Sequence, residues 1–162
     1  MQQETKKRIY IDTSIPSSYY TLRTGEDALA KQRTTRYWWN EYANQFSLTS
    51  STIVIEELIR GKGEATQTRR ALIESLEMLP ITDRILQIAR IYTDRLVMPQ
   101  DPHGDALHVA IASFHNVNAI LTWNLAHIAN PNKVHLIQQV NRELGLPTPD
   151  LTTPLDYFGG AD

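Results

Sequence analysis

Short apolar runs alternate with helical segments along this chain, and this alternation constrains the fold more than any other feature. Runs typical of β-strands occupy residues 8–11, 46–49 and 119–122. Helical patterns occupy residues 28–43, 52–60, 64–79, 82–97, 105–114 and 134–144. Strands that alternate with helices form parallel sheets covered on both faces. The sequence therefore predicts an α/β fold: a three-layer α/β/α sandwich with a mostly parallel central sheet. The tail from Pro147 is expected to add a short strand or to wrap the surface.

Capping residues predict where several of these helices begin and end. Ser14 is expected to cap a helix after the first strand, and Ser50 or Ser51 the helix after the second. Gly61 and Gly145 stand where a glycine after a helix commonly ends it.

Length and composition indicate one globular domain over residues 1–162, with 41% hydrophobic and 21% charged residues. The absence of cysteine excludes disulfides, a thiolate nucleophile and cysteine-bound metals, so any metal would be held by oxygen or imidazole. The N-terminus passes from polar residues straight into the first strand, without a long apolar segment. We therefore expect a cytoplasmic protein that does not enter membranes.

Two acidic residues stand at positions where a carboxylate needs a partner. Asp12 directly follows a buried strand, where it must be hydrogen-bonded, solvated or paired; a plain turn or cap role is the alternative. Glu56 precedes Arg60 by four residues, which predicts an ion pair on the helix surface. Glu57 has no such cation on its face, so it is the better candidate for binding a metal or a hydrogen-bond donor.

A third acid, Asp105, opens the most apolar helix of the chain. The helix dipole alone would stabilise a carboxylate there. His108 follows one turn later and could contact a phosphate or hold the acid, although packing in the interior is the more ordinary role.

The net charge of −2 gives no general sign of nucleic-acid binding, so a basic surface would have to be local. Solvated helix faces are the ordinary alternative for each candidate. The candidates are Arg60, Lys62, Arg69, Arg70, Arg33 and Arg36.

If the three acids converge, their repulsion would be relieved by a hard divalent cation, and oxygen ligands favour Mg²⁺ or Mn²⁺. Such ions activate water for phosphodiester hydrolysis. The chain has no P-loop, no GxGxxG after the first strand, no GxSxG and no HExxH.

Four short segments, taken together, resemble the PIN-domain family, in particular its VapC-like toxin branch. They are Tyr10–Ser14, Glu57–Gly61, Asp105–Ala112 and Leu121–Ile128, and they appear in the family's order. The resemblance implies an α/β/α sandwich whose acidic cluster binds Mg²⁺ or Mn²⁺ and cuts RNA, often with an antitoxin partner encoded alongside. It also implies that Asp12, Glu57 and Asp105 are the metal ligands and that Ser14 occupies a small hydroxyl position.

The fourth segment departs from that pattern. Asn124 stands where many members have a fourth acid, and His127 where some have another Asp. Asn124 could still donate an oxygen or orient a water, but the smaller charge puts a second metal in doubt.

The leading hypothesis is a metal-dependent endoribonuclease with Asp12, Glu57, Asp105 and Asn124 as catalytic residues. Ser14, Arg60 and His108 are expected to contact the RNA substrate. The alternative is a catalytically weak or inactive module of the same fold that binds RNA or protein. A phosphoacceptor domain using Asp12 fits poorly, because no acidic pair or suitably placed lysine accompanies it.

A homodimer is also expected, as in PIN-like proteins. An aromatic cluster could lie at its interface, and a plain core role is the alternative. The cluster comprises Tyr37, Trp38, Trp39 and Tyr42.

Overall fold

A computed structural model describes residues 6–61, 63, 65–95, 104–124 and 131–158 of the chain. Helices and strands alternate along it. The elements are β1 (Arg8–Ile11), α1 (Ser14–Tyr19), α2 (Glu26–Glu41), the 3-10 helix η1 (Ala43–Gln45), β2 (Ser47–Ser50), α3 (Thr52–Arg60), α4 (Thr66–Glu74), β3 (Glu77–Met78), α5 (Asp83–Asp94), α6 (Asp105–Phe114), β4 (Ala119–Leu121), α8 (Pro131–Leu144) and β5 (Asp150–Thr152).

The five described strands form one parallel sheet in the order β3-β2-β1-β4-β5. Ile9 in the central strand lies opposite Leu48 of β2 on one side and Ala119 of β4 on the other. The strand at the C-terminal edge confirms that the Pro-rich tail adds a short strand, with Asp150 opposite Ala119.

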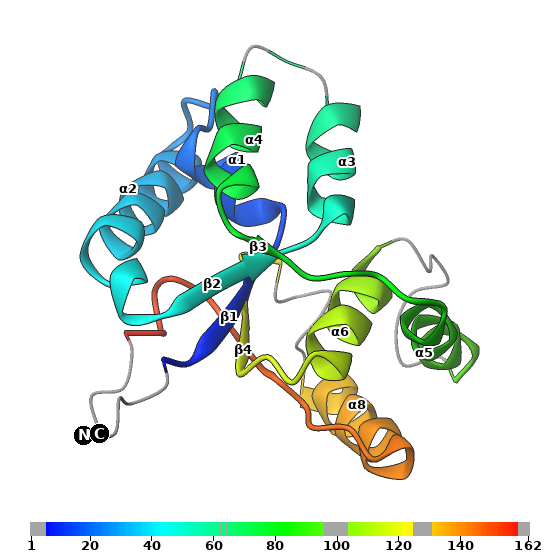
Figure 1. The fold of residues 1–162 in the computed structure, drawn as a ribbon. Coiled ribbons are helices and arrows are strands. Elements are labelled where there is room, and N and C mark those ends of the chain that lie inside the picture. The colour runs from blue at the N-terminus through cyan, green and yellow to red at the C-terminus, as the bar shows by residue number, and fades with distance from the viewer. Residues whose placement is uncertain (1–5, 62, 64, 96–103, 125–130, 159–162) are drawn as a thin grey trace, which may run out of the picture.

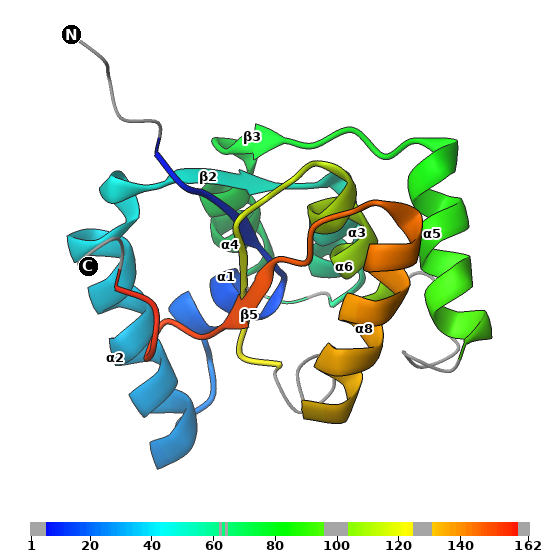
Figure 2. The same cartoon turned by 90° about the horizontal axis from the view of Figure 1, so that it is seen from below.

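Helices cover both faces of this sheet (Figure 1). The helices from α1 to α4 lie on one face, and α5, α6 and α8 lie on the other, as the turned view in Figure 2 also shows. The three-layer α/β/α sandwich predicted from the sequence is thereby confirmed. No helix in the described part of the chain combines the length and apolar character needed to cross a membrane.

The central strand β1 and helix α6 both lie in the core. Ile9, Tyr10 and Ile11 are fully buried, and every residue of α6 from Ala106 to Ser113 is buried as well. Helix α6 has the bounds predicted from its apolar composition, and its burial on all sides is confirmed.

The strand order reverses between β1 and β4. The chain runs outward from β1 through β2 to β3, then returns across the sheet to β4 and β5. In parallel sheets, the crevice at such a reversal, beyond the carboxyl ends of the strands, is where ligands bind. Asp12 follows β1 there and Thr122 follows β4.

Some predicted helix ends were wrong. The helix expected over 64–79 ends at Glu74, because Glu77–Met78 pairs with β2 as an edge strand. Gly61 ends α3 with φ −65°, so it does not need the left-handed conformation, whereas Gly145 does adopt it with φ 73°. The helix expected over 82–97 begins at Asp83; residues 96 and 97 lie outside the described residues.

The serines expected to cap helices do not do so with their side chains. The hydroxyl of Ser50 donates to the carbonyl of Ile11, and that of Ser51 bonds to Tyr10 Oη. Thr13, rather than Ser14, is the N-cap residue of α1, and its side chain makes no capping hydrogen bond. These hydroxyls lie within or beside the candidate site, which explains why they are engaged there.

Candidate active site

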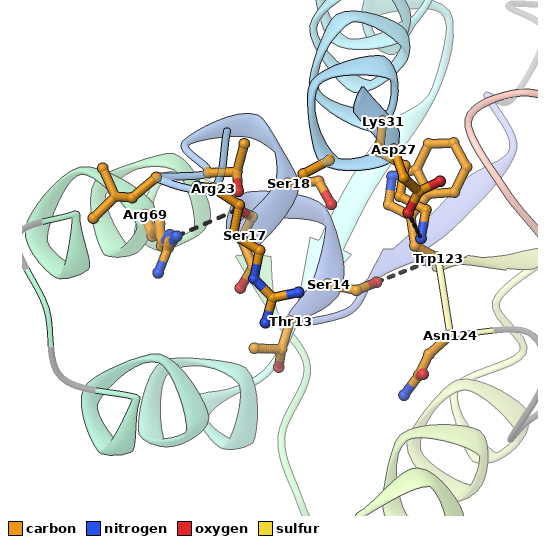
Figure 3. Close-up of a pocket in the computed structure, with 13 residues that line it drawn as sticks. Thr13, Ser14, Ser17, Ser18, Arg23, Asp27, Lys31, Arg69, Trp123 and Asn124 are labelled. Atoms are coloured by element: carbon orange, nitrogen blue, oxygen red, sulfur yellow. Dashed lines mark hydrogen bonds and ion pairs between the residues drawn. The ribbon is translucent and has the colours of Figure 1, made fainter. Parts of the chain in front are cut away.

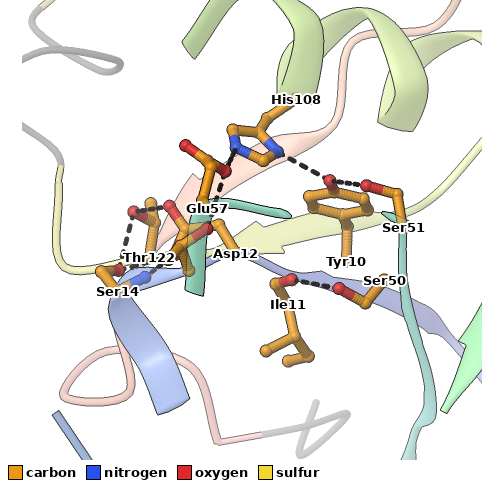
Figure 4. Close-up of polar contacts among 10 residues, drawn as sticks. Tyr10, Ile11, Asp12, Ser14, Ser50, Ser51, Glu57, His108 and Thr122 are labelled. Carbon is orange, nitrogen blue, oxygen red and sulfur yellow. Dashed lines mark hydrogen bonds and ion pairs between the residues drawn. The ribbon is translucent and has the colours of Figure 1, made fainter. Parts of the chain in front are cut away.

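Asp12 lies at the carboxyl end of β1, 4% exposed. Its Oδ1 accepts hydrogen bonds from the backbone N–H and the hydroxyl of Ser14, at 3.0 and 2.6 Å, and its Oδ2 accepts one from the Thr122 hydroxyl at 2.6 Å (Figure 4). Burial raises the pKa of Asp12, while the charge of His108 and these hydrogen bonds oppose the rise. The Asp12 carboxylate is therefore held by Ser14, which follows β1, and by Thr122, which follows β4.

Ser14 joins the two halves of the sheet at this point. Its Oγ donates to Asp12 and accepts a hydrogen bond of 2.8 Å from the backbone N–H of Trp123, which follows β4. The prediction that this side chain caps a helix was wrong, because its hydroxyl donates a hydrogen bond to the nearby buried carboxylate instead.

Glu57 reaches the same region from α3. Its Oε1 accepts hydrogen bonds from Thr13 Oγ1 at 2.8 Å and from His108 Nε2 at 2.7 Å. Partial burial raises the pKa of Glu57, but the hydrogen bond and charge of His108, the Thr13 hydroxyl and the charge of Arg60 lower it further, so the net shift is downward. The expectation that Glu57 needs a donor agrees with these contacts; its metal role stays a prediction.

Arg60, at the end of α3, lies on the surface and forms no ion pair with Glu56 among the described residues. Its charge acts on Glu57 instead. The Glu56–Arg60 pair expected from the four-residue spacing was therefore wrong, and substrate contact by Arg60 stays a prediction.

His108 connects the acids to the core. Its ring is 3% exposed, with Nδ1 bonded to Tyr10 Oη at 2.7 Å and Nε2 bonded to Glu57, and Tyr10 Oη continues to Ser51 Oγ at 2.8 Å (Figure 4). A protonated imidazole donates both of these hydrogen bonds. Burial lowers the pKa of His108, yet its hydrogen bond to Glu57 and the charges of Glu57, Asp12 and Asp105 outweigh burial and raise it.

All three predicted acids act on one histidine, Glu57 by a hydrogen bond and Asp12 and Asp105 by their charges. Asp105 opens α6 one turn before His108, is half-buried, and acts on it through its charge. Three carboxylates against one imidazolium leave negative charge in excess. No group of three or more His, Asp or Glu residues in the described ranges is close enough to hold a metal ion in this arrangement. The donor chemistry suits Mg²⁺ or Mn²⁺, because all three acids offer hard oxygens.

A groove adjoins the acids on the side of α1 and α2, with a volume of about 690 Å³ (Figure 3). We call it the basic groove. Its lining residues are Thr13, Ser14, Ser17, Ser18, Thr21, Leu22, Arg23, Asp27, Ala28, Lys31, Arg69, Trp123 and Asn124. Asn124 is thereby placed at the wall of this groove, where its backbone N–H donates to Thr122 Oγ1 at 2.9 Å.

Sequence reasoning missed several residues of the site. Thr13 and Thr122 are neutral side chains next to the predicted acids, and only their positions just after strands could have indicated them. Tyr10 could have been found as a hydroxyl on a buried strand, which requires a partner. Of the basic candidates, Arg69 lines the groove; Lys62 lies outside the described residues. Arg23 and Lys31 were not considered.

Neither protein-family models nor curated proteins gave a match to this chain. Solved structures with a similar fold were found. One is VapBC2 from Rickettsia felis bound to a DNA fragment from their promoter, with 15% identity, a TM-score of 0.57, and coverage of 90% of this chain and 98% of that chain. Another is FitAcB from Neisseria gonorrhoeae, with 14% identity, a TM-score of 0.54, and coverage of 92% and 99%.

These comparisons correct the family assignment made from the four sequence segments. Membership of the PIN-domain family and its VapC-like branch was wrong as an assignment, because no family model matches the chain. Identities of 14–15% to VapBC2 and FitAcB show a shared fold and nothing finer. Four short segments in the order of a family are therefore too little sequence to assign this chain to that family.

Proposed function

We propose that this chain is a metal-dependent endoribonuclease that acts as one component of a toxin–antitoxin pair. The observation that carries the proposal is that Glu57 bonds to His108 and that the charges of Asp12 and Asp105 also act on His108 near the strand reversal, beside a groove lined with cations. An acidic cluster next to a basic surface suits a phosphodiester, whose backbone needs positive charge and whose cleavage needs an activated water.

The excess negative charge supports a divalent cation. Asp12, Glu57 and Asp105 would hold Mg²⁺ or Mn²⁺ through their oxygens. When bound, the ion lowers the pKa of water and stabilises the leaving oxygen. Repulsion between the carboxylates, which His108 offsets only in part, would favour binding.

The protein's own residues position the acids. Ser14 and Thr122 fix both oxygens of Asp12, while Thr13 and His108 fix Oε1 of Glu57. No hydrogen bond from the described residues reaches Glu57 Oε2, so this oxygen can face a ligand. We assign His108 a positioning role, because both of its ring nitrogens are engaged inside the protein.

The toxin–antitoxin part of the proposal is supported by the likeness to VapBC2 and FitAcB. An antitoxin protein partner and a homodimer belong to the same proposal. Within the aromatic cluster expected at a dimer interface, Trp38 is fully buried in the core, whereas Tyr37 is 57% exposed. Sedimentation of the purified chain tests the dimer directly.

One observation favours the second candidate, a non-catalytic module that binds RNA or protein. No three acids or histidines in the described part of the chain are gathered tightly enough to hold a metal as they stand.

The deciding experiment measures Mn²⁺ binding by calorimetry and cleavage of a fluorogenic RNA in Mn²⁺. Glu57→Gln should weaken cleavage by roughly 100-fold or more, since altering even the supports of metal ligands costs 10–100-fold. Glu56→Gln is the matched control, because Glu56 is the exposed neighbour on the same helix. Equal cleavage by the two folded variants, or no Mn²⁺ binding by the wild type, would favour the non-catalytic module.

A further inference from the structure

The basic groove runs up to the residues that hold both acids. Ser14 lines it and donates to Asp12, and Thr13 lines it and donates to Glu57. A molecule in the groove is therefore separated from Asp12 by the Ser14 side chain and from Glu57 by the Thr13 side chain. We propose that the groove binds a single RNA strand by its phosphates, chiefly through Arg23 and Lys31, and leads it to the acids. That the bound strand is then cleaved rests on the proposed function.

Charge is the first argument. The whole chain has a net charge of −2, yet the groove lining has three cations and one acid. That acid, Asp27, forms a 3.4 Å ion pair with Lys31, but its side chain is 87% exposed, so solvent weakens the pair. The lining therefore attracts a polyanion, although the molecule as a whole carries a negative net charge.

The cations differ in what they can do. Arg69 is committed to the wall, because its Nη2 donates to the carbonyl of Tyr20 at 3.0 Å and its Nε is buried without a partner among the described residues. The side chain of Arg23 forms no hydrogen bond or ion pair within the described chain, and only its backbone N–H bonds to Thr21. Arg23 and Lys31 are therefore the groups that can turn toward phosphates.

Shape and lining favour a single strand over other polyanions and over protein. A hollow of about 690 Å³ has the size of a small-ligand site, which is too small for two paired backbones. Figure 3 shows Arg69 on one side of it and Trp123 with Lys31 on the other. Serine and threonine hydroxyls supply further phosphate donors. An amphipathic protein helix would need a mainly apolar groove, and here Leu22, Ala28 and Trp123 are the apolar lining.

The test is fluorescence anisotropy of a short labelled single-stranded RNA at low salt, with EDTA present so that metal-dependent cleavage does not interfere. Lys31→Glu and Arg23→Glu should each weaken binding about tenfold and make its dependence on salt less steep, as the loss of one phosphate contact does. Arg33→Glu is the matched control, because it reverses a charge on the same helix at an exposed position outside the groove. Circular dichroism verifies that each variant folds. Lys31→Gln replaces Lys31→Glu if the latter does not fold.

The outcomes separate this inference from the proposed function. Equal RNA affinity in the groove variants and Arg33→Glu would overturn the inference, as would preference for duplex RNA. Absence of RNA binding would overturn it too and would leave a protein segment as the occupant. Binding that depends on Lys31 and Arg23 supports the groove even if Mn²⁺ produces no cleavage, a result that would sink the ribonuclease alone.

Discussion

Neutral hydroxyl groups hold two of the three predicted acids, Asp12 and Glu57, in place. Thr122 and Ser14 donate to Asp12, and Thr13 donates to Glu57. Hydrogen bonds to a buried carboxylate are stronger than those between neutral groups and are costly to leave unmade. At the scale of single residues, stability and site geometry therefore depend on the same side chains.

Removing the Thr122 hydroxyl should destabilise the protein. Thr122→Val leaves Asp12 Oδ2 without its 2.6 Å donor and Asn124 N–H without its acceptor, so urea unfolding should show a loss of about 1–3 kcal/mol. Thr122→Ser keeps the hydroxyl and is the control. If the valine and serine variants were equally stable, the hydrogen bond to Asp12 would have no measurable role in stability.

Two buried tyrosines should make the fold sensitive to alkali. Burial raises the pKa of Tyr10 and Tyr92, so the folded protein keeps protons that the unfolded chain loses near pH 10. This stability is fully present below pH 10 and is lost as the pH rises above it. From pH 10 to 11, Tyr10 should lower the free energy of unfolding by about 1 kcal/mol, and Tyr92 should lower it further.

Urea unfolding at the two pH values measures this loss, and Tyr92→Phe is the comparison. The variant loses the hydrogen bond to Asn141 and starts less stable, but its stability should decline less with pH than that of the wild type. Parallel declines would show that Tyr92 ionises as readily in the folded state as in the unfolded one.

Among the secondary-structure elements, prediction from sequence succeeded where the cause is local. Helices α3 and α6 have the predicted bounds. Helix α3 begins just after strand β2 and ends before Gly61, and α6 is apolar along its whole length, so local sequence defines both. Strand β3 was missed because two residues become a strand only by pairing with β2, while Leu72, Leu76 and Leu79 have helical spacing. A short edge strand depends on a distant partner that no local pattern contains.

The end of α8 offers a test at this scale. Gly145 adopts φ 73°, so Gly145→Ala should lower stability by about 1 kcal/mol through backbone strain, since nothing lies near the added methyl group. Gly63→Ala is the control, because Gly63 also has open space and no such φ. Thermal unfolding compares the two, and an equal midpoint for both variants would contradict the strain argument.

For the whole molecule, the alternation of strands and helices was enough to predict the three-layer α/β/α sandwich with its parallel sheet. The strand order, which brings β4 beside β1, was not predictable, because nothing in the sequence states which strands are neighbours. The same limit applied to the basic groove. Trp123 lies 92 positions after Lys31 in the sequence, and the two residues meet only through the packing of α2 beside the end of β4.

Metal binding should stabilise the entire fold, because the acids come from elements on both faces of the sheet. At Mn²⁺ concentrations of about 100 times the dissociation constant, the free energy of unfolding should rise by about 2.7 kcal/mol. Urea unfolding with and without Mn²⁺ measures the rise. Glu57→Gln should abolish it and Glu56→Gln should retain it; a rise in both would place the ion elsewhere.

The hydrogen bond between Asp12 and Thr122 joins residues 110 positions apart. During synthesis, Asp12 leaves the ribosome long before the strand that precedes Thr122 exists. A growing chain therefore carries Asp12 without Thr122, and Glu57 without His108, until late in synthesis. If the finished protein cuts RNA, the messenger from which it is being translated is spared until almost the last part of the sheet has been made.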